Sequence, residues 1–66
     1  MEPVIVEHHE RVAVVTLNDP ERRNTLSFPL CDALVATMER LEQDAHTGAV
    51  VITGAPPAFC AGAALG

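Results

Sequence analysis

The apolar residues of this chain form three short runs, which predict three β-strands. Residues 12–17 are almost continuously apolar, a pattern typical of a strand that is buried on both faces. Residues 4–7 predict a shorter strand before it, and the polar segment 8–10 predicts the turn between the two. We therefore expect an antiparallel hairpin. Residues 49–53 predict a third strand later in the chain.

A stripe of larger apolar residues separates the second run from the third and predicts a helix. Its members recur at spacings of four, four and three residues, close to the helical period: Leu30, Leu34, Met38 and Leu41. Ser27 is a suitable N-terminal cap, and Pro29 falls in the first turn, where a missing N–H costs little. Because Gly48 can end the segment in a left-handed conformation, we predict a helix over residues 28–45.

The order of these elements predicts an α/β fold made of a hairpin plus a βαβ unit. The helix can cover one face of the sheet, and nothing else in the sequence can cover the other face. At 66 residues the chain is at most one small domain. A chain of this size usually needs a disulfide, a metal or a partner for stability.

Charge and cysteine content narrow the classes of partner and location. The formal net charge of -5 argues against nucleic-acid binding through a basic face, although Arg22 and Arg23 leave a local site for an anion open. Cys31 and Cys60 are too few and too far apart for a disulfide framework, so we expect free thiols and a cytoplasmic location. No apolar run approaches the ~20 residues of a membrane span, so no membrane is expected as a partner.

The most informative segment is the last one, residues 54–66, which is rich in Gly, Ala and Pro. Small residues let a ligand approach the main chain, and exposed N–H groups in such a loop can stabilise a developing oxyanion. A turn with a purely structural role has the same composition, and spacing alone leaves both interpretations open. Gly54, Gly62 and Gly66 match neither a phosphate-binding loop nor a dinucleotide-binding loop.

The other chemistry-bearing residues have structural interpretations beside their functional ones. Adjacent residues on a strand point to opposite faces, so His8 and His9 are not expected to share a metal ion. Cys60 is expected to pack against its surroundings rather than act as a nucleophile. Three acidic residues, at the loop and the helix end, are expected to be solvated charges: Asp19, Glu21 and Asp44.

Three segments of the chain match, in order and spacing, elements that one enzyme family shares. Residues 12–23 match its opening strand and loop. The following segment, Arg23-Asn24-Thr25-Leu26, matches a Lys/Arg-Asn-Ala-Leu element. Behind the strand Val-Val-Ile-Thr-Gly, residues 58–63 match the segment Ala-Phe-Cys-Ala-Gly-Ala. The chain thus resembles the N-terminal part of the crotonase superfamily, also called the enoyl-CoA hydratase/isomerase family.

This resemblance implies a crotonase-like fold, a ββα spiral, of which residues 1–66 would be the N-terminal portion of a single domain. It also implies an acyl-CoA thioester as substrate, as in fatty acid metabolism, and assembly into homotrimers or hexamers. No cofactor is implied beyond the coenzyme A of the substrate. By motif match, the backbone N–H of Ala63 is the first of two oxyanion donors.

The same motif match assigns six further positions to substrate binding. Four would line the channel for CoA and the acyl thioester: Ala61, Gly62, Ala64 and Leu65. Arg23 and Thr25 would lie near the adenine and phosphates of CoA. The chain departs from the family pattern at Ala64, where many members have Asp, and at Thr25, where Ala is commoner.

The family's second oxyanion donor and its acid–base residues would lie beyond Gly66. We therefore expect the remainder of the site to come from the rest of the same chain or from a second chain, and residues 1–66 alone to be inactive. Enoyl-CoA hydratase is the leading interpretation, with an isomerase or another crotonase-type reaction as alternatives. A non-catalytic acyl-CoA-binding member and an inactive truncated fragment also remain open.

Overall fold

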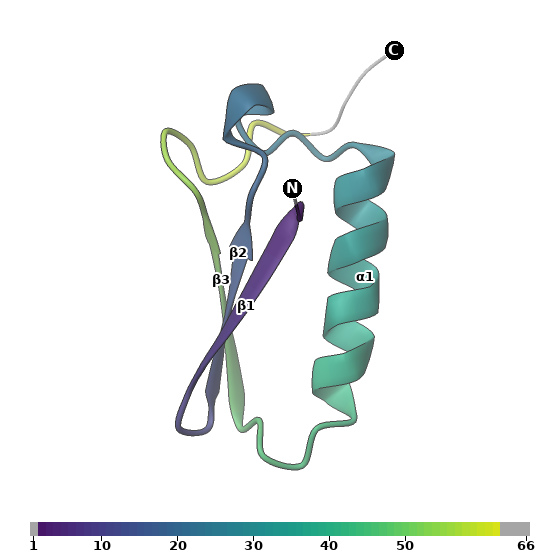
Figure 1. The fold of residues 1–66 in the computed structure, drawn as a ribbon, viewed down its shortest axis with the longest axis vertical. Helices are drawn as coiled ribbons and strands as arrows, with labels where there is room; N and C mark the ends of the chain where they lie inside the picture. Colours follow the sequence, from purple (N-terminus) through teal and green to yellow (C-terminus); the bar gives the residue numbers. More distant parts are fainter. Residues whose placement is uncertain (1, 63–66) are drawn as a thin grey trace.

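The computed structural model describes residues 2–62, which form a three-stranded sheet with one helix packed against it (Figure 1). In chain order the elements are β1 (Val4–His9), β2 (Val12–Leu17), a short 3-10 turn (Pro20–Arg22), α1 (Phe28–Glu42) and β3 (Ala49–Gly54). The strand order is β1-β2-β3, with β1 antiparallel and β3 parallel to β2. The predicted hairpin and βαβ unit are both confirmed.

The hairpin turn lies two residues later than predicted. His8 pairs with Ala13 and His9 with Val12, so both histidines belong to β1 rather than to a turn. The chain reverses at residues 10–11, where Glu10 has a φ of 57°. A two-residue hairpin loop needs such left-handed backbone, whereas polar side chains are tolerated at the end of an edge strand. The turn was predicted too early because His8 and His9 are polar, a property typical of turn residues.

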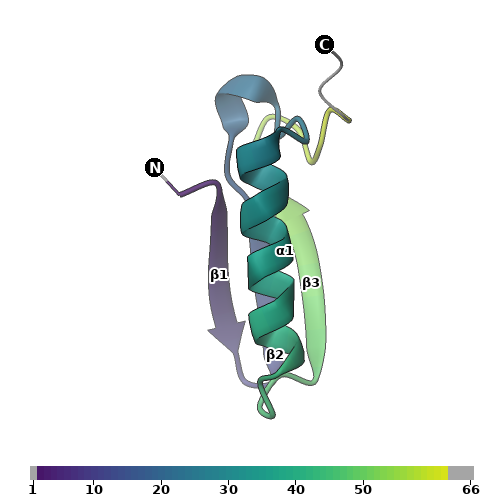
Figure 2. The same ribbon diagram turned by 90° about the vertical axis from the view of Figure 1, so that its right-hand side faces the viewer.

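Helix α1 covers one face of the sheet and leaves the other uncovered (Figure 2). Ala13, Val15 and Leu17 face the helix and are buried, and the alternate residues of β2 are only half-buried. The prediction that residues 12–17 are buried on both faces is thus wrong within the described residues, because a single helix supplies a single covering layer. The predicted helical stripe is confirmed, since Leu30 and Leu41 are buried and Leu34 and Met38 pack against them.

The start of α1 is as predicted, but its end is not. Leu30 N–H donates to the Ser27 hydroxyl at 3.4 Å, and Pro29 lies in the first turn. The helix ends at Glu42, three residues before the predicted residue 45. Among the described glycines Gly62 is the one with a positive φ, so Gly48 is no left-handed cap.

A turn built on Asp44 replaces the predicted glycine cap. The Asp44 carboxylate accepts hydrogen bonds from His46 N–H at 2.9 Å and from the Thr47 hydroxyl at 2.8 Å. Gly48 N–H instead donates at 2.7 Å to the carbonyl of Arg11, in the hairpin turn directly before β2. Side-chain hydrogen bonds of this kind compete with helical ones and so end the helix early.

Strand β3 has no buried residue, unlike β1 and β2. Val51 is 49% exposed and Ile52 is 42% exposed, and in the described part of the chain no further strand pairs with the outer edge of β3. Among residues 2–62 there is no helix long and apolar enough to span a membrane.

Candidate functional site

The loop after β2 is held in a tight, partly left-handed conformation. Arg22 N–H donates to the Asp19 carbonyl at 3.1 Å and Arg23 N–H to the Pro20 carbonyl at 3.0 Å. Arg23 and Asn24 have φ values of 53° and 57°. Thr25 then donates both its backbone N–H and its hydroxyl to the Arg22 carbonyl. The loop therefore presents the exposed Arg23 side chain from a fixed backbone.

Asn24 connects this loop to the segment that follows β3. Its side chain is fully buried at 0% exposure. The Oδ1 atom accepts from Asp19 N–H at 2.7 Å, and Nδ2 donates to the carbonyls of Ala55 at 3.1 Å and Ala58 at 2.8 Å. The Asn24 side chain thus binds two residues that lie 31 and 34 positions further along the chain.

The segment after β3 folds back closely over the end of that strand. A Cβ atom at Gly54 would lie 2.7 Å from Phe59 Cα and 2.8 Å from the Ala58 carbonyl oxygen, so only glycine fits there. Cys60 packs against the core, as the sequence predicts. Leu26 N–H donates to the Gly62 carbonyl at 2.8 Å, which brings the two motif segments together at one end of the sheet.

The predicted binding residues divide into a described and an undescribed group. Arg23, Thr25, Ala61 and Gly62 lie together at this end of the fold, on the two segments that the Leu26–Gly62 hydrogen bond joins. Ala61 and Gly62 are exposed, and a Cβ atom at Gly62 would meet nothing within 4 Å. The other predicted positions, Ala63, Ala64 and Leu65, lie outside the described residues.

Two features of this site were not apparent from the sequence. The Thr25 hydroxyl, expected beside the adenine, is hydrogen-bonded to the Arg22 carbonyl of its own loop. The sequence marks Asn24 only as one position of a motif. An Asn next to a turn, in a segment that needs left-handed backbone, was the single local signal for it.

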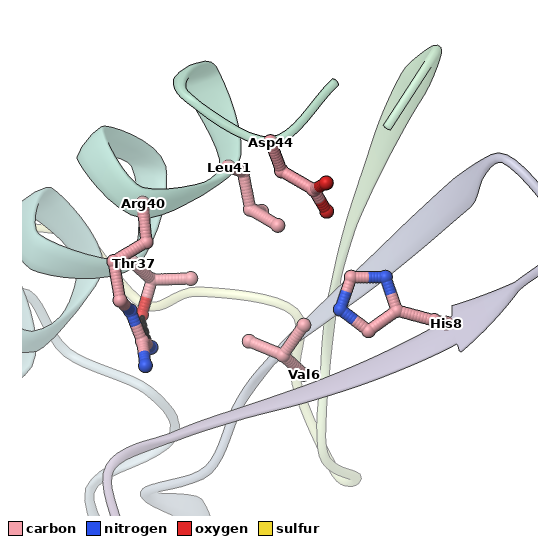
Figure 3. A pocket seen from close by; sticks show the side chains of 6 residues that line it. All are labelled: Val6, His8, Thr37, Arg40, Leu41 and Asp44. Carbon is pink, nitrogen blue, oxygen red and sulfur yellow. Dashed lines mark hydrogen bonds between the residues drawn. The ribbon is translucent and has the colours of Figure 1, made fainter. Parts of the chain in front are cut away.

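A hollow lies near the C-terminal end of α1, between the helix and β1 (Figure 3). It encloses about 190 Å³ and is lined by Val6, His8, Thr37, Arg40, Leu41 and Asp44. Arg40 donates to the Thr37 hydroxyl at 3.5 Å. The backbone N–H of His46 and the hydroxyl of Thr47 hold the pKa of Asp44 below its ordinary value.

The histidines and cysteines form no shared site in this part of the chain. His8 lines the hollow, whereas His9 lies 3.4 Å from the Glu7 carboxylate on the other face of the strand. Within residues 2–62 no three His, Cys, Asp or Glu side chains gather in a way that could hold a metal ion. Cys31 and Cys60 are both free thiols.

Three features of the chain bear on its family: the ββαβ segment, the left-handed loop that contains Asn24, and the segment rich in Gly and Ala after β3, residues 55–66. A sequence model of the family described as enoyl-CoA hydratase/isomerase matches residues 7–66. The chain belongs to this family, which places it in the crotonase superfamily.

Curated relatives match nearly the whole chain but are much longer. A probable enoyl-CoA hydratase of Mycobacterium tuberculosis is 45% identical over 64 residues, which are 97% of this chain and 25% of that protein. A hydroxycinnamoyl-CoA hydratase-lyase of Pseudomonas fluorescens is 44% identical over 59 residues, which are 89% of this chain and 21% of that protein. The chain thus spans about a fifth to a quarter of the length of these curated relatives.

Solved structures confirm that this segment has the crotonase fold. An enoyl-CoA hydratase from Mycobacterium avium superposes with a TM-score of 0.92 at 42% identity, covering 97% of this chain and 29% of that one. A monofunctional enoyl-CoA isomerase from M. smegmatis also gives a TM-score of 0.92, at 33% identity, covering 94% of this chain and 30% of that one. The fold of this segment is therefore common to proteins named for two different reactions.

Proposed function

We propose that this chain is the N-terminal part of an acyl-CoA-processing enzyme, and that the whole enzyme adds water to a 2-enoyl-CoA thioester. The observation that carries the proposal is the junction between the Thr25-Leu26 segment and Gly62, closed by the 2.8 Å hydrogen bond from Leu26 N–H. It joins the proposed CoA-binding loop to the proposed oxyanion loop. The hydratase names of the relatives in Mycobacterium support the reaction class.

The chemistry proposed for the tail is stabilisation of a thioester oxyanion by backbone N–H groups. In this proposal the N–H of Ala63 is the first donor and polarises the thioester carbonyl as negative charge develops on its oxygen. The Gly62 carbonyl belongs to the peptide group that leads to Ala63. Gly62 and Ala61 have no bulk that would keep the acyl thioester away from this backbone.

The polar part of the substrate is assigned to the loop after β2. CoA carries phosphate groups, and a guanidinium suits their geometry and charge. Arg23 is exposed on a backbone that hydrogen bonds hold in place, which supports its proposed role near the phosphates. Thr25 stabilises the same loop through its bonds to the Arg22 carbonyl.

The remaining parts of the site are proposed to come from outside residues 1–66. They are the second oxyanion donor and the acid–base groups that activate water, supplied by the rest of the chain or by a second chain. The exposed face of the sheet supports such a covering partner, and we further propose a homotrimer or hexamer of the whole protein. The two free cysteines support a cytoplasmic location.

An isomerase is the second candidate, because the M. smegmatis isomerase superposes as well as the M. avium hydratase, each with a TM-score of 0.92. The two enzymes would share the oxyanion chemistry and differ in the acid–base groups. Residues 2–62 therefore support the shared chemistry of the site rather than one of the two reactions.

The test is an assay of the purified full-length protein with crotonyl-CoA and with a 3-enoyl-CoA. Addition of water, seen as loss of the conjugated enoyl absorbance and a product heavier by one water, would support the hydratase. Double-bond migration without a gain in mass would support the isomerase. CoA binding without turnover of either substrate would identify a non-catalytic member, and neither binding nor turnover would overturn the proposal. Residues 1–66 expressed alone should be inactive in the same assay.

A further inference from the structure

Asn24 is one of only two buried polar residues in the described part of the chain, the other being Thr37. Thr37 lies on α1, where it accepts a 3.5 Å hydrogen bond from Arg40. Asn24 lies between two loops that carry the proposed substrate-binding residues. A buried amide loses its hydrogen bonds to water, so it persists only where the protein supplies replacements.

The side chain of Asn24 is fully satisfied in a single orientation. Its oxygen faces the N–H of Asp19, and its nitrogen faces two carbonyl oxygens, those of Ala55 and Ala58. An amide nitrogen has two protons to donate, and each of the two carbonyls takes one. A flipped amide would oppose oxygen to oxygen, so the three bonds fix the side chain and both loops together.

Other residue types cannot replace all of these contacts. Asn also adopts left-handed backbone more readily than most residues, and here its φ is 57°. Asp would keep the acceptor for Asp19 N–H but would place a carboxylate against two carbonyl oxygens. Gly would keep the backbone conformation and lose every side-chain bond.

Two of the three bonds act on the segment that leads to Gly62. Ala55 and Ala58 begin this segment, and the Leu26 N–H holds its far end through the Gly62 carbonyl. Between these points Cys60 packs against the core, whereas Phe59 is 58% exposed. Besides this packing and the 2.8 Å hydrogen bond from Ala55 N–H to the Leu17 carbonyl, the hydrogen bonds from Asn24 and Leu26 fix the course of the segment, and both of these donors lie on the same loop.

We propose that Asn24 is a positioning residue of the acyl-CoA site. Through the carbonyls of Ala55 and Ala58 it sets the course of residues 55–62, the segment that the proposed function places beside the acyl thioester. Through Asp19 N–H it fixes the loop that carries Arg23 relative to that backbone. The inference rests on the proposed function and assigns a role to a residue that does not touch the substrate.

The test compares Asn24→Asp with Asn18→Asp in the full-length protein. Asn18 is the control, because its Nδ2 also donates to the backbone, in this case to the Glu2 carbonyl at 3.0 Å. This bond ties the loop to the start of the chain and makes no contact with residues 55–62. A small misplacement of a catalytic group can cost about a hundredfold in rate. We expect Asn24→Asp to lower kcat by about ten- to a hundredfold with a smaller change in KM. Asn18→Asp should leave both constants near those of the wild type.

Asn24→Gly provides a second variant if the buried carboxylate prevents folding. It should give the same selective loss of kcat, because it too releases the carbonyls of Ala55 and Ala58. An unchanged kcat in a folded Asn24 variant would overturn the proposal. So would a loss of kcat that Asn18→Asp reproduces.

A second measurement separates this inference from the proposed function. Hydrogen exchange of the backbone amides in residues 55–62 should become faster in the Asn24 variants and stay unchanged in Asn18→Asp. If the wild type turns over neither enoyl-CoA while this exchange pattern holds, the proposed function fails and the anchoring of the segment stands. If exchange is unchanged, the positioning role itself is refuted.

Discussion

At the scale of single residues, Gly54 allows the chain to fold back on the end of β3. A methyl group there would meet the backbone of residues 58–59, with Ala58 O at 2.8 Å and Phe59 Cα at 2.7 Å. Backbone atoms cannot move aside as the end of a flexible side chain can. We therefore expect Gly54→Ala to lower the free energy of unfolding of the full-length protein by about 1–3 kcal/mol, a typical cost of overpacking.

Gly48→Ala is the matched control for this substitution. A Cβ atom at Gly48 would lie 3.2 Å from Nε of the Arg11 side chain, which can move. The free energy of unfolding should change little, or rise slightly because alanine restricts the unfolded chain. Urea unfolding of both variants measures the two free energies of unfolding. Equal values would show that residues 58–59 are not packed on Gly54.

At the scale of elements, the end of α1 depends on the ionised carboxylate of Asp44. Hydrogen bonds from His46 N–H and the Thr47 hydroxyl lower the pKa of Asp44 from 3.8. A carboxyl whose pKa is lowered by folding stabilises the folded state above its unfolded pKa, and this contribution is lost as pH falls through the folded pKa. The stability that Asp44 supplies should thus be present at neutral pH and disappear below about pH 4.

Asp44→Asn tests this pH dependence. The free energy of unfolding of the wild type should exceed that of the variant at neutral pH, and the difference should shrink in acid. Thr47→Val removes one of the two donors and should give part of the same effect. A difference between wild type and Asp44→Asn that is constant across the acid range would contradict the role of the charged group.

The elements that local sequence determines were predicted well. Residues 12–17 and the start of α1 at Ser27 and Pro29 depend on apolar periodicity, capping and the geometry of proline, which act over a few residues. The end of α1 was placed too late because the hydrogen bonds of Asp44 compete with the helix, and apolar spacing does not report them.

The candidate site was predictable only as far as its motifs. Arg23, Thr25, Ala61 and Gly62 were found through resemblance, and the structure brings their two segments together. Asn24 could not be assigned its contacts from sequence, because its partners Ala55 and Ala58 are 31 and 34 residues away. Such contacts follow from the parallel pairing of β2 with β3, which places the ends of both strands side by side.

At the scale of the whole molecule, β3 is a strand with exposed apolar residues on both of its faces. On the face away from α1, β1 presents Ile5, at 37% exposure, beside the polar Glu7 and His9, whereas β3 presents Val51 at 49% exposure. Ile52, on the helix side of β3, is also exposed, and Figure 2 shows β3 at the edge of the sheet. A strand with exposed apolar residues on both faces is typical of a sheet interior. We therefore expect the rest of the protein to pack on β3 rather than on β1.

Val51→Thr in the full-length protein tests which part of the sheet is covered. Thr is close to Val in shape and in preference for strands, so at an exposed site the free energy of unfolding should change by no more than about 0.5 kcal/mol. At a covered site the hydroxyl loses its water, and we expect a loss of about 1–3 kcal/mol. Val35→Thr is the control, because Val35 is 56% exposed on α1 and Val and Thr have similar helix propensities. The free energies of unfolding are measured in urea. If Val51→Thr lowers this free energy no more than Val35→Thr does, β3 stays at the surface of the whole protein. The remainder of the acyl-CoA site would then have to approach residues 55–62 from another side.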